Sequence, residues 1–244
     1  TLDGTLFPYT TLFRSDYEVS IIHNQKTITV KESYIRPQTG NLGIISDIDD
    51  TFLVSYTLNP LRKLYILLFR NVNSRKVFKD VVTHYQALST SGRTTDEEQN
   101  AFFYVSSSEW NLYRFIVKFT EIHKLPKAVL LLKDIKTSLK DFFWSGRGDH
   151  NHKFEKIKHI LEFYPNLKYV LMGDDSQEDP FLYEAICKIF PVSVKAVYIR
   201  KTGMKEKEKV SIVMKNLENL NVSSCYFTHS SEAIQHSKKI GLIL

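Results

Sequence analysis

Apolar runs of strand length alternate with helix-like patterns along most of this chain. Six such runs end in small, polar or charged residues, and they are LGIISDIDD (42–50), AFFYVSSSEW (101–110), AVLLLKD (128–134), KYVLMGDD (168–175), SVKAVYIR (193–200) and SCYFTHS (224–230). Between them, apolar residues recur at helical spacing over 110–123, 153–164, 180–189 and 231–240. This alternation is typical of an α/β fold built on a parallel, doubly wound sheet.

The beginning of the chain has a different pattern. Residues 16–35 alternate in polarity and are rich in β-branched side chains, which predicts strands ahead of the α/β region. Residues 37–43 contain one proline and two glycines, and we interpret them as a linker.

Acidic and hydroxyl residues gather where three of the runs end, in DIDDT, SSSEW and GDDSQED. In a doubly wound sheet, ligands bind beyond the carboxyl ends of the strands. The sequence therefore predicts that the chemistry of this protein lies at one edge of the sheet.

The first acidic cluster directly follows an apolar strand. Because alternate residues of a strand point the same way, Asp47 and Asp49 are expected to converge just past its end. Two close carboxylates repel each other, and a Mg²⁺ ion would offset that repulsion. One carboxylate is then a candidate nucleophile and the other a candidate general acid/base. The alternative is an acidic turn in which Asp50 caps a helix.

The second acidic cluster begins with Gly173, which allows a tight turn. Asp174 would lie beside the first cluster if the two strands are neighbours, and it would then be a hard oxygen ligand for the metal. Asp179 would hold metal-bound water. Its alternative role is the N-cap of a helix that has Pro180 in its first turn.

Two weaker signals accompany the carboxylates. The hydroxyls of 106–108 suit a phosphate at a strand end, although a serine-rich turn is common without any function. Lys153 follows the polar stretch GRGDHNH and could neutralise a phosphoryl group, although a single lysine is normally only solvated.

Taken in this order, the clusters resemble the haloacid-dehalogenase-type phosphatase superfamily, whose motifs are D-x-D-x-T, a strand-end Ser/Thr, a Lys and an acidic G-D turn. More closely, DIDDT, FYVSSSEWNLY, LLLKD, HKFEKI and GDDSQEDPFLYE are similar to the actin-patch phosphatidate phosphatase family, a distant relative of the lipins. YIRKTG and HSSEAIQHSKKIGL extend the similarity to the end of the chain. The resemblance implies a haloacid-dehalogenase-like Rossmannoid fold with a helical cap inserted after the first motif.

The resemblance also implies a role for each motif residue. Asp47 would be the nucleophile, Asp49 the general acid/base, and Lys153 the cation that steadies the nucleophile and the charge on phosphorus. Asp174 would hold Mg²⁺ together with Asp47 and the backbone carbonyl of Asp49. The expected substrate contacts are Thr51, Ser106, Ser107 and Lys153, and the expected metal contacts are Asp47, Asp49, Asp174 and Asp179.

Some positions depart from the family pattern. The fourth motif commonly reads GDSGQxDPE, whereas this chain has Asp175, Ser176 and Phe181 at three of its positions. Asp175 adds a carboxylate to this motif. The sequence does not decide whether Asp175 or Asp179 belongs to the metal shell. In the second motif, Ser107 and Glu109 replace the expected Asn and Pro, which changes the expected substrate contacts.

Charge adds a possible surface for anionic partners. The net charge is +6, and residues 61–80 contain six Lys/Arg and one acid. This stretch lies in the predicted cap, about 52–100, and combines basic with apolar residues, as in LNPLRKLYILLFRNVNSRK. Three interpretations stay open: a solvated helical face, a helix that packs on the core, and a surface that contacts a lipid or anionic interface. No apolar run reaches the roughly 20 residues that span a bilayer.

The N-terminal residues repeat part of the first motif as TLDGTL. The nucleophile of that copy would fall at Thr1, and no apolar strand precedes it. Residues 5–15 resemble the in-frame translation of a sequencing-adapter oligonucleotide, so we interpret 1–15 as an artefact. We interpret 16–40 as the remnant of a preceding β-rich domain plus linker, and 41–244 as the catalytic domain.

The sequence therefore predicts a Mg²⁺-dependent phosphatidate phosphatase that forms diacylglycerol through an aspartyl-phosphate. One alternative is the same chemistry on a soluble phosphomonoester or a nucleic-acid end, although no nucleic-acid-binding motif is present. The other is a non-catalytic phosphatidate-binding module, against which the pairing of Asp47 with Asp49 argues. Two cysteines without metal or redox spacing, Cys187 and Cys225, are expected to be buried thiols. We expect a cytoplasmic protein with peripheral membrane contact, and the sequence gives no oligomeric state.

Overall fold

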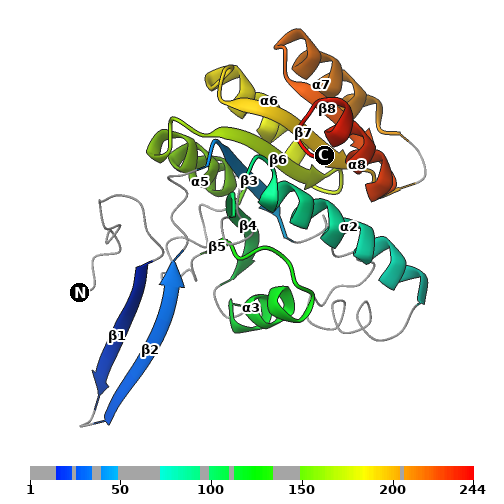
Figure 1. Cartoon of the computed structure of the whole chain (residues 1–244). Helices are drawn as coiled ribbons and strands as arrows, with labels where there is room; N and C mark the ends of the chain where they lie inside the picture. Colours follow the sequence, from blue (N-terminus) through cyan, green and yellow to red (C-terminus); the bar gives the residue numbers. More distant parts are fainter. Residues whose placement is uncertain are drawn as a thin grey trace.

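The structure is a computed structural model that describes residues 15–23, 26–34, 40–48, 72–93, 99–109, 113–133, 149–203 and 206–244 (Figure 1). Its centre is a six-stranded sheet in the order β5-β4-β3-β6-β7-β8, in which every neighbouring pair is parallel. The strands are β3 (Leu42–Asp47), β4 (Ala101–Glu109), β5 (Val129–Lys133), β6 (Lys168–Asp174), β7 (Val194–Arg200) and β8 (Ser223–Phe227). The predicted doubly wound parallel sheet is thus confirmed.

The strand order contains a topological switch point. The chain runs outward from β3 through β4 to β5, then returns to the other side of β3 as β6 and continues outward to β8. The carboxyl ends of β3 and β6 lie side by side at this reversal. In open α/β sheets, this is the place where ligands bind.

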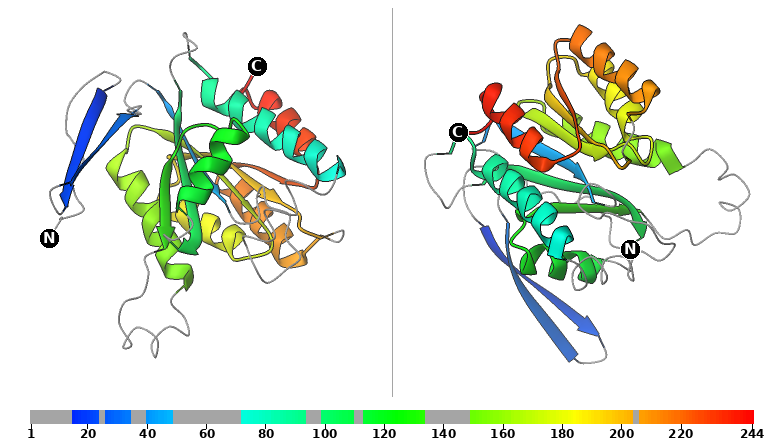
Figure 2. Two further views of the ribbon diagram at one scale, coloured as in Figure 1. Left: turned by 90° about the horizontal axis from the view of Figure 1, so that it is seen from below. Right: turned by 90° about the vertical axis from the view of Figure 1, so that its right-hand side faces the viewer.

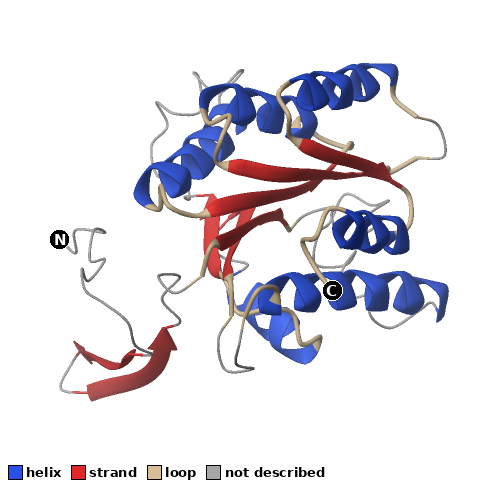
Figure 3. Cartoon of the chain, turned by 45° about the horizontal axis from the view of Figure 1, so that its top comes forward, coloured by secondary structure: helices blue, strands red, loops and turns tan. Residues whose placement is uncertain are grey.

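Helices cover both faces of the sheet (Figure 3). Core packing places α2 (Val72–Thr90), α3 (Tyr113–Ile122) and α8 (Ser230–Lys239) on one face. The other face is covered by α5 (Asp149–Phe163), α6 (Asp179–Ile189) and α7 (Glu208–Asn219). In the part of the chain that the structure describes, no helix is long and apolar enough to cross a bilayer.

The four inner strands, β3, β4, β6 and β7, are buried on both faces, and this explains their continuous apolar runs. In β3, for example, Ile44 packs into the core under α2 and α8, whereas Ile45 packs under α5 and α6. Cys187 is buried as predicted, with a pKa that burial raises to about 12. Cys225 is only half-buried, so the prediction of a fully buried thiol is wrong there.

Helix α2 was not predicted as an element of its own. It lies within the range assigned to the cap, and its Val81, Tyr85 and Leu88 point into the core at helical spacing. This packing begins at Val81, beyond the basic and apolar stretch 58–76, whose side chains lie outside the described residues, so all three interpretations of that stretch stay predictions. A cap formed by other parts of 52–100 stays a prediction, because 49–71 and 94–98 lie outside the described residues.

The predicted N-terminal strands are confirmed. Strands β1 (Ser15–His23) and β2 (Lys26–Tyr34) pair antiparallel as a hairpin. They form a two-stranded sheet of their own and do not join the central sheet (Figure 2). Their origin in a preceding β-rich domain stays a prediction.

Candidate active site

Two aspartates stand at the switch point of the sheet. Asp47 is the last residue of β3 and Asp174 the last residue of β6, and both are fully buried. The two strands are in register with Ser46 opposite Met172. The two strands are neighbours, which is the condition under which Asp174 is expected to lie beside the first cluster.

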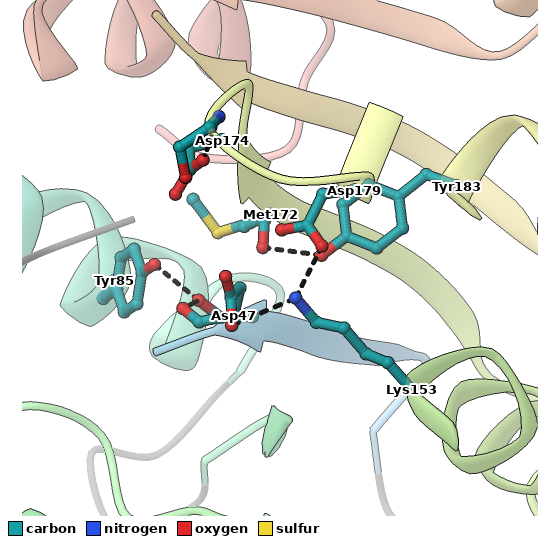
Figure 4. Close-up of polar contacts among 9 residues, drawn as sticks. Asp47, Tyr85, Lys153, Met172, Asp174, Asp179 and Tyr183 are labelled. Atoms are coloured by element: carbon teal, nitrogen blue, oxygen red, sulfur yellow. Dashed lines mark hydrogen bonds and ion pairs between the residues drawn. The ribbon is translucent and has the colours of Figure 1, made fainter. Parts of the chain in front are cut away.

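A buried lysine joins the first of these aspartates to a third carboxylate. Nζ of Lys153 lies 3.1 Å from Oδ1 of Asp47 and 2.5 Å from Oδ1 of Asp179 (Figure 4). The lysine side chain is 7% exposed, and the two carboxylates are 0% and 1% exposed. Buried charges of this kind persist only when they are paired, so the lysine is not a solvated surface residue.

Helix α5 places the lysine by its apolar face. Lys153, Ile157 and Leu161 follow one another at a spacing of four residues, and the last two are buried in the core. The lysine is thus carried toward the sheet by the packing of its own helix. Burial alone would lower the pKa of Lys153, but the carboxylates of Asp47 and Asp179 raise it above its ordinary value.

The N-cap alternative for Asp179 is wrong. The N-cap of α6 is Glu178, which makes no side-chain capping bond, and Asp179 is the first residue inside the helix with Pro180 after it. Its carboxylate instead accepts the hydrogen bond from Lys153. The other oxygen, Oδ2, is buried and has no hydrogen-bond partner among the described residues. The prediction that Asp179 holds metal-bound water is not tested by this arrangement.

The turn after β6 sends its two adjacent aspartates in different directions. Oδ1 of Asp174 accepts a hydrogen bond from the backbone N–H of Ser176 at 2.5 Å, which closes the turn. Asp175 accepts hydrogen bonds from the N–H of Thr202 at 2.8 Å and from the hydroxyl of Tyr226 at 2.6 Å. Lys207 also pairs with Asp175, at 3.4 Å.

These partners define what Asp175 does. Burial alone would raise the pKa of Asp175, but the hydrogen bonds from Thr202 and Tyr226 and the charge of Lys207 hold it below its ordinary value. Its Oδ1 is bound by Thr202, which follows β7, and its Oδ2 is bound by Tyr226, which lies in β8. Asp175 therefore anchors the acidic turn to the neighbouring loop.

The other predicted residues are only partly placed. Ser106 is buried in β4, one residue beyond the position paired with Asp47. Ser107 belongs to the same strand, but its side chain is outside the described set. Asp49 and Thr51 lie outside the described residues altogether.

The fit of the residues to Mg²⁺ can be judged from the described part of the site. Within it, no group of three or more His, Cys, Asp or Glu side chains could hold a metal ion. Two strand-end carboxylates, Asp47 and Asp174, do lie on neighbouring strands. Mg²⁺ usually takes one or two carboxylates and completes its shell with water and substrate phosphate. The donor set therefore fits Mg²⁺.

Sequence reasoning missed several buried polar residues around the site. The hydroxyl of Tyr183 on α6 donates to the carbonyl of Met172 at 2.9 Å, and the hydroxyl of Tyr85 on α2 contacts Ser46 at 2.6 Å (Figure 4). Arg200 ends β7 opposite Asp174 and donates to Ser230 at 2.7 Å. For these residues, the one signal in the sequence is that the apolar run 193–200 ends in a basic residue, Arg200.

Gly173 gives a direct test of the packing around Asp179. An added Cβ would lie 2.9 Å from Cβ and 3.0 Å from Cγ of Asp179, which Lys153 holds in place. Gly173→Ala is therefore expected to lower the free energy of unfolding by about 1–3 kcal/mol, because the added methyl group would overpack the site. Denaturant unfolding measures the loss. Gly203→Ala is the control, since nothing lies within 4 Å of its added Cβ, and equal stability of the two variants would contradict the described packing.

Fold and site together define a doubly wound α/β protein with a buried aspartate–lysine–aspartate cluster at the switch point. Residues 42–201 match the family model described as the catalytic domain of phosphatidate phosphatase APP1. Since this match covers more than half of the chain, the protein belongs to that family.

The chain is also similar in sequence to a yeast protein. The chain is 27% identical over 172 residues to a Saccharomyces cerevisiae protein named phosphatidate phosphatase APP1. The aligned region covers 70% of this chain and 27% of the yeast protein, so the chain spans about a quarter of its relative's length. No solved structure matches the chain.

Proposed function

We propose that this chain is the catalytic part of a Mg²⁺-dependent phosphatidate phosphatase that works through an aspartyl-phosphate on Asp47. The observation that supports the proposal best is Lys153 bridging Asp47 and Asp179 at the switch point of the sheet. The family match adds the substrate class, since the matching model is described as the catalytic domain of phosphatidate phosphatase APP1.

In the first step, a carboxylate oxygen of Asp47 attacks the phosphorus of phosphatidate. The bond between phosphorus and the glycerol oxygen breaks, and Asp49 gives its proton to the leaving alkoxide, which becomes diacylglycerol. Lys153 keeps the nucleophile in place through Oδ1 and offsets negative charge near the phosphoryl group.

In the second step, water attacks the phosphorus of the aspartyl-phosphate. Asp49, now ionised, takes a proton from that water, the acyl phosphate bond breaks, and inorganic phosphate leaves. The carboxylate of Asp47 is regenerated. Asp179 is proposed to keep Lys153 aligned in both steps, because its Oδ1 lies 2.5 Å from Nζ.

Mg²⁺ would be held by Asp47, Asp174 and the backbone carbonyl of Asp49, and it would neutralise charge on the phosphoryl oxygens. Asp174 is suited to this role because the turn that follows it fixes its carboxylate through Ser176. Asp175 is proposed to stay outside the metal shell, because both of its oxygens are bound elsewhere.

The test is Mg²⁺-dependent phosphate release from residues 16–244, compared with the Asp49→Asn variant. Each protein is offered phosphatidate in mixed micelles and a small aryl phosphate, with Mg²⁺ and with EDTA. We expect release from phosphatidate that needs Mg²⁺ and is lost in the variant. Release from the aryl phosphate but not from phosphatidate would favour a soluble substrate. Lipid binding without release would favour the non-catalytic module.

We also propose that the basic residues around 61–80 bring the site to anionic membranes. Lys76→Glu is expected to lower activity on anionic vesicles about tenfold, since each basic residue near such a surface contributes about 1 kcal/mol. Activity on the soluble aryl phosphate should be unchanged. Lys215→Glu, an exposed position on α7 at the opposite face of the sheet, is the matched control. An equal loss on vesicles in both variants would leave only a net-charge effect.

A further inference from the structure

A short hydrogen-bond chain connects helix α2 to the backbone of Asp47. The hydroxyl oxygen of Tyr85 lies 2.6 Å from Oγ of Ser46, and Oγ of Ser46 donates to the carbonyl of Asp47 at 2.8 Å. Both side chains are buried, with Tyr85 1% and Ser46 0% exposed. Because the single proton of the Ser46 hydroxyl is used on the carbonyl, Tyr85 must donate to Ser46.

The direction of this chain is supported by the state of the phenol. Burial raises the pKa of Tyr85 well above its ordinary value, so the hydroxyl stays protonated and remains a donor. The ring is also packed on Phe102, with 5.8 Å between centroids, which fixes where the hydroxyl points. Tyr85 thus presents a fixed donor to the end of β3.

We propose that Tyr85 is a positioning residue for Asp47, acting through Ser46. The carbonyl of Asp47 belongs to the peptide that leads out of the strand toward Asp49. Holding that carbonyl fixes the last backbone torsion of Asp47 and the direction in which the chain leaves the sheet. The expected effect on the reaction rate rests on the proposed function, whereas the hydrogen-bond chain does not depend on it.

Asp47 is therefore held from both faces of the sheet. Its side chain is held by Lys153 of α5, and its backbone carbonyl is held by Ser46, whose hydroxyl contacts Tyr85 of α2 (Figure 4). Neither contact alone fixes a carboxylate, because the side chain can swing about a mobile backbone. Catalysis by positioning is sensitive to small displacements, so the backbone contact matters for the rate.

The test is Tyr85→Phe, which keeps the ring and removes only the hydroxyl. We expect kcat to fall about fivefold to tenfold, the value of one buried hydrogen bond, with KM for the aryl phosphate unchanged. Ser46→Ala should show the same loss. The double variant should be no worse than the worse single variant, because both substitutions break one chain. Losses that multiply in the double variant would overturn the proposal.

The matched control is Tyr104→Phe. Tyr104 is equally buried and lies on the same face of the sheet, but its single hydroxyl proton is donated to the carbonyl of Pro126 at 3.3 Å. The control should lose a similar amount of stability and keep its kcat. Equal kcat values for Tyr85→Phe and Tyr104→Phe would overturn the proposal and leave Tyr85 with a packing role.

A second measurement separates this inference from the proposed function. Amide hydrogen exchange in the peptide that contains Asp47 and Ile48 should be about fivefold faster in Tyr85→Phe than in wild type. The reason is that the end of β3 has lost the hydrogen bond between Tyr85 and Ser46. It should be unchanged in Tyr104→Phe. If the wild type releases no phosphate but exchange responds as expected, the proposed function fails and the positioning stands. Unchanged exchange in Tyr85→Phe contradicts the positioning whatever the activity.

Discussion

Asp47→Asn is expected to lower phosphate release by at least about a thousandfold, because an amide cannot form the acyl phosphate on which the covalent path depends. The fold should survive the change. Asparagine has nearly the same shape, and Lys153 keeps its shorter contact, to Asp179 at 2.5 Å. Steady-state release of phosphate from phosphatidate measures the loss, and circular dichroism reports the fold.

The control for this variant is Asp175→Asn, at a second buried aspartate of the same site region. Its carboxylate is bound by Thr202, Tyr226 and Lys207. Weakening these bonds should cost about 1–3 kcal/mol of stability, with much less effect on turnover. The two variants are therefore expected to show opposite patterns, one losing activity and the other losing stability.

Two outcomes would contradict the role of Asp47. One is phosphate release by a folded Asp47→Asn protein at a rate close to that of Asp175→Asn. The other is the absence of a phosphoryl adduct on Asp47 when turnover of the wild type is quenched in acid and the peptides are analysed by mass spectrometry. The first outcome removes Asp47 from the chemistry, and the second removes the covalent intermediate.

The sheet could be predicted from the sequence because its four inner strands are buried on both faces. Continuous apolar runs, each closed by polar residues, mark such strands and also mark the edge where they end. Helix α7 was nevertheless missed, although Val210, Val213, Met214 and Leu217 carry the spacing of a buried helical face. That spacing is present in the sequence itself, so this helix needs no tertiary information to be predicted.

The contacts of the site could not be predicted in the same way. Lys153 and Asp179 are 26 residues apart on two different helices, and Ser46 and Tyr85 are 39 residues apart. Local patterns say which face of an element is apolar, but they do not say which polar side chains of two elements meet. The N-cap assigned to Asp179 failed for this reason, since a tertiary partner took a carboxylate that local rules would have used on the backbone.

The same limit applies to the paired aspartates of the fourth motif. The sequence predicts Asp174 as a metal ligand and leaves open whether Asp175 or Asp179 also belongs to the metal shell. In the structure the contacts of Asp174 and Asp175 differ, because the strand ends at Asp174 and the next residue turns toward Thr202 and Tyr226. Neither partner is near in sequence, so the difference is visible only in the fold.

Lys153→Met is expected to be the most destabilising single change in the site. It would leave the carboxylates of Asp47 and Asp179 buried without the cation that they share. Breaking a buried charge pair in this way costs about 3–5 kcal/mol. Turnover should fall about a hundredfold to a thousandfold as well, since a positioned charge next to the reacting group is lost. Denaturant unfolding and phosphate release measure the two effects.

The stability loss should not depend on pH in the neutral range. The pKa of Lys153 is raised in the folded protein above its ordinary value of 10.5. Its contribution to stability is therefore complete below about that ordinary value, and it is lost only as the pH rises through the higher folded value. Unfolding free energies of Lys153→Met and wild type should differ by the same amount at pH 7 and at pH 9, and a difference that shrinks between them would contradict the charge assignment.

The cause of the loss can be isolated with two further variants. Lys158→Met, on the same helix, removes a partly exposed lysine that lies 3.7 Å from Glu162, and a surface pair of this kind contributes at most about 1 kcal/mol. Lys153→Met combined with Asp179→Asn removes one of the two buried charges left behind, so it should recover stability relative to Lys153→Met without recovering turnover. If Lys153→Met is no less stable than Lys158→Met, the buried cluster contributes nothing to the fold. If the double variant is less stable than Lys153→Met, Asp179 is held by something other than its charge.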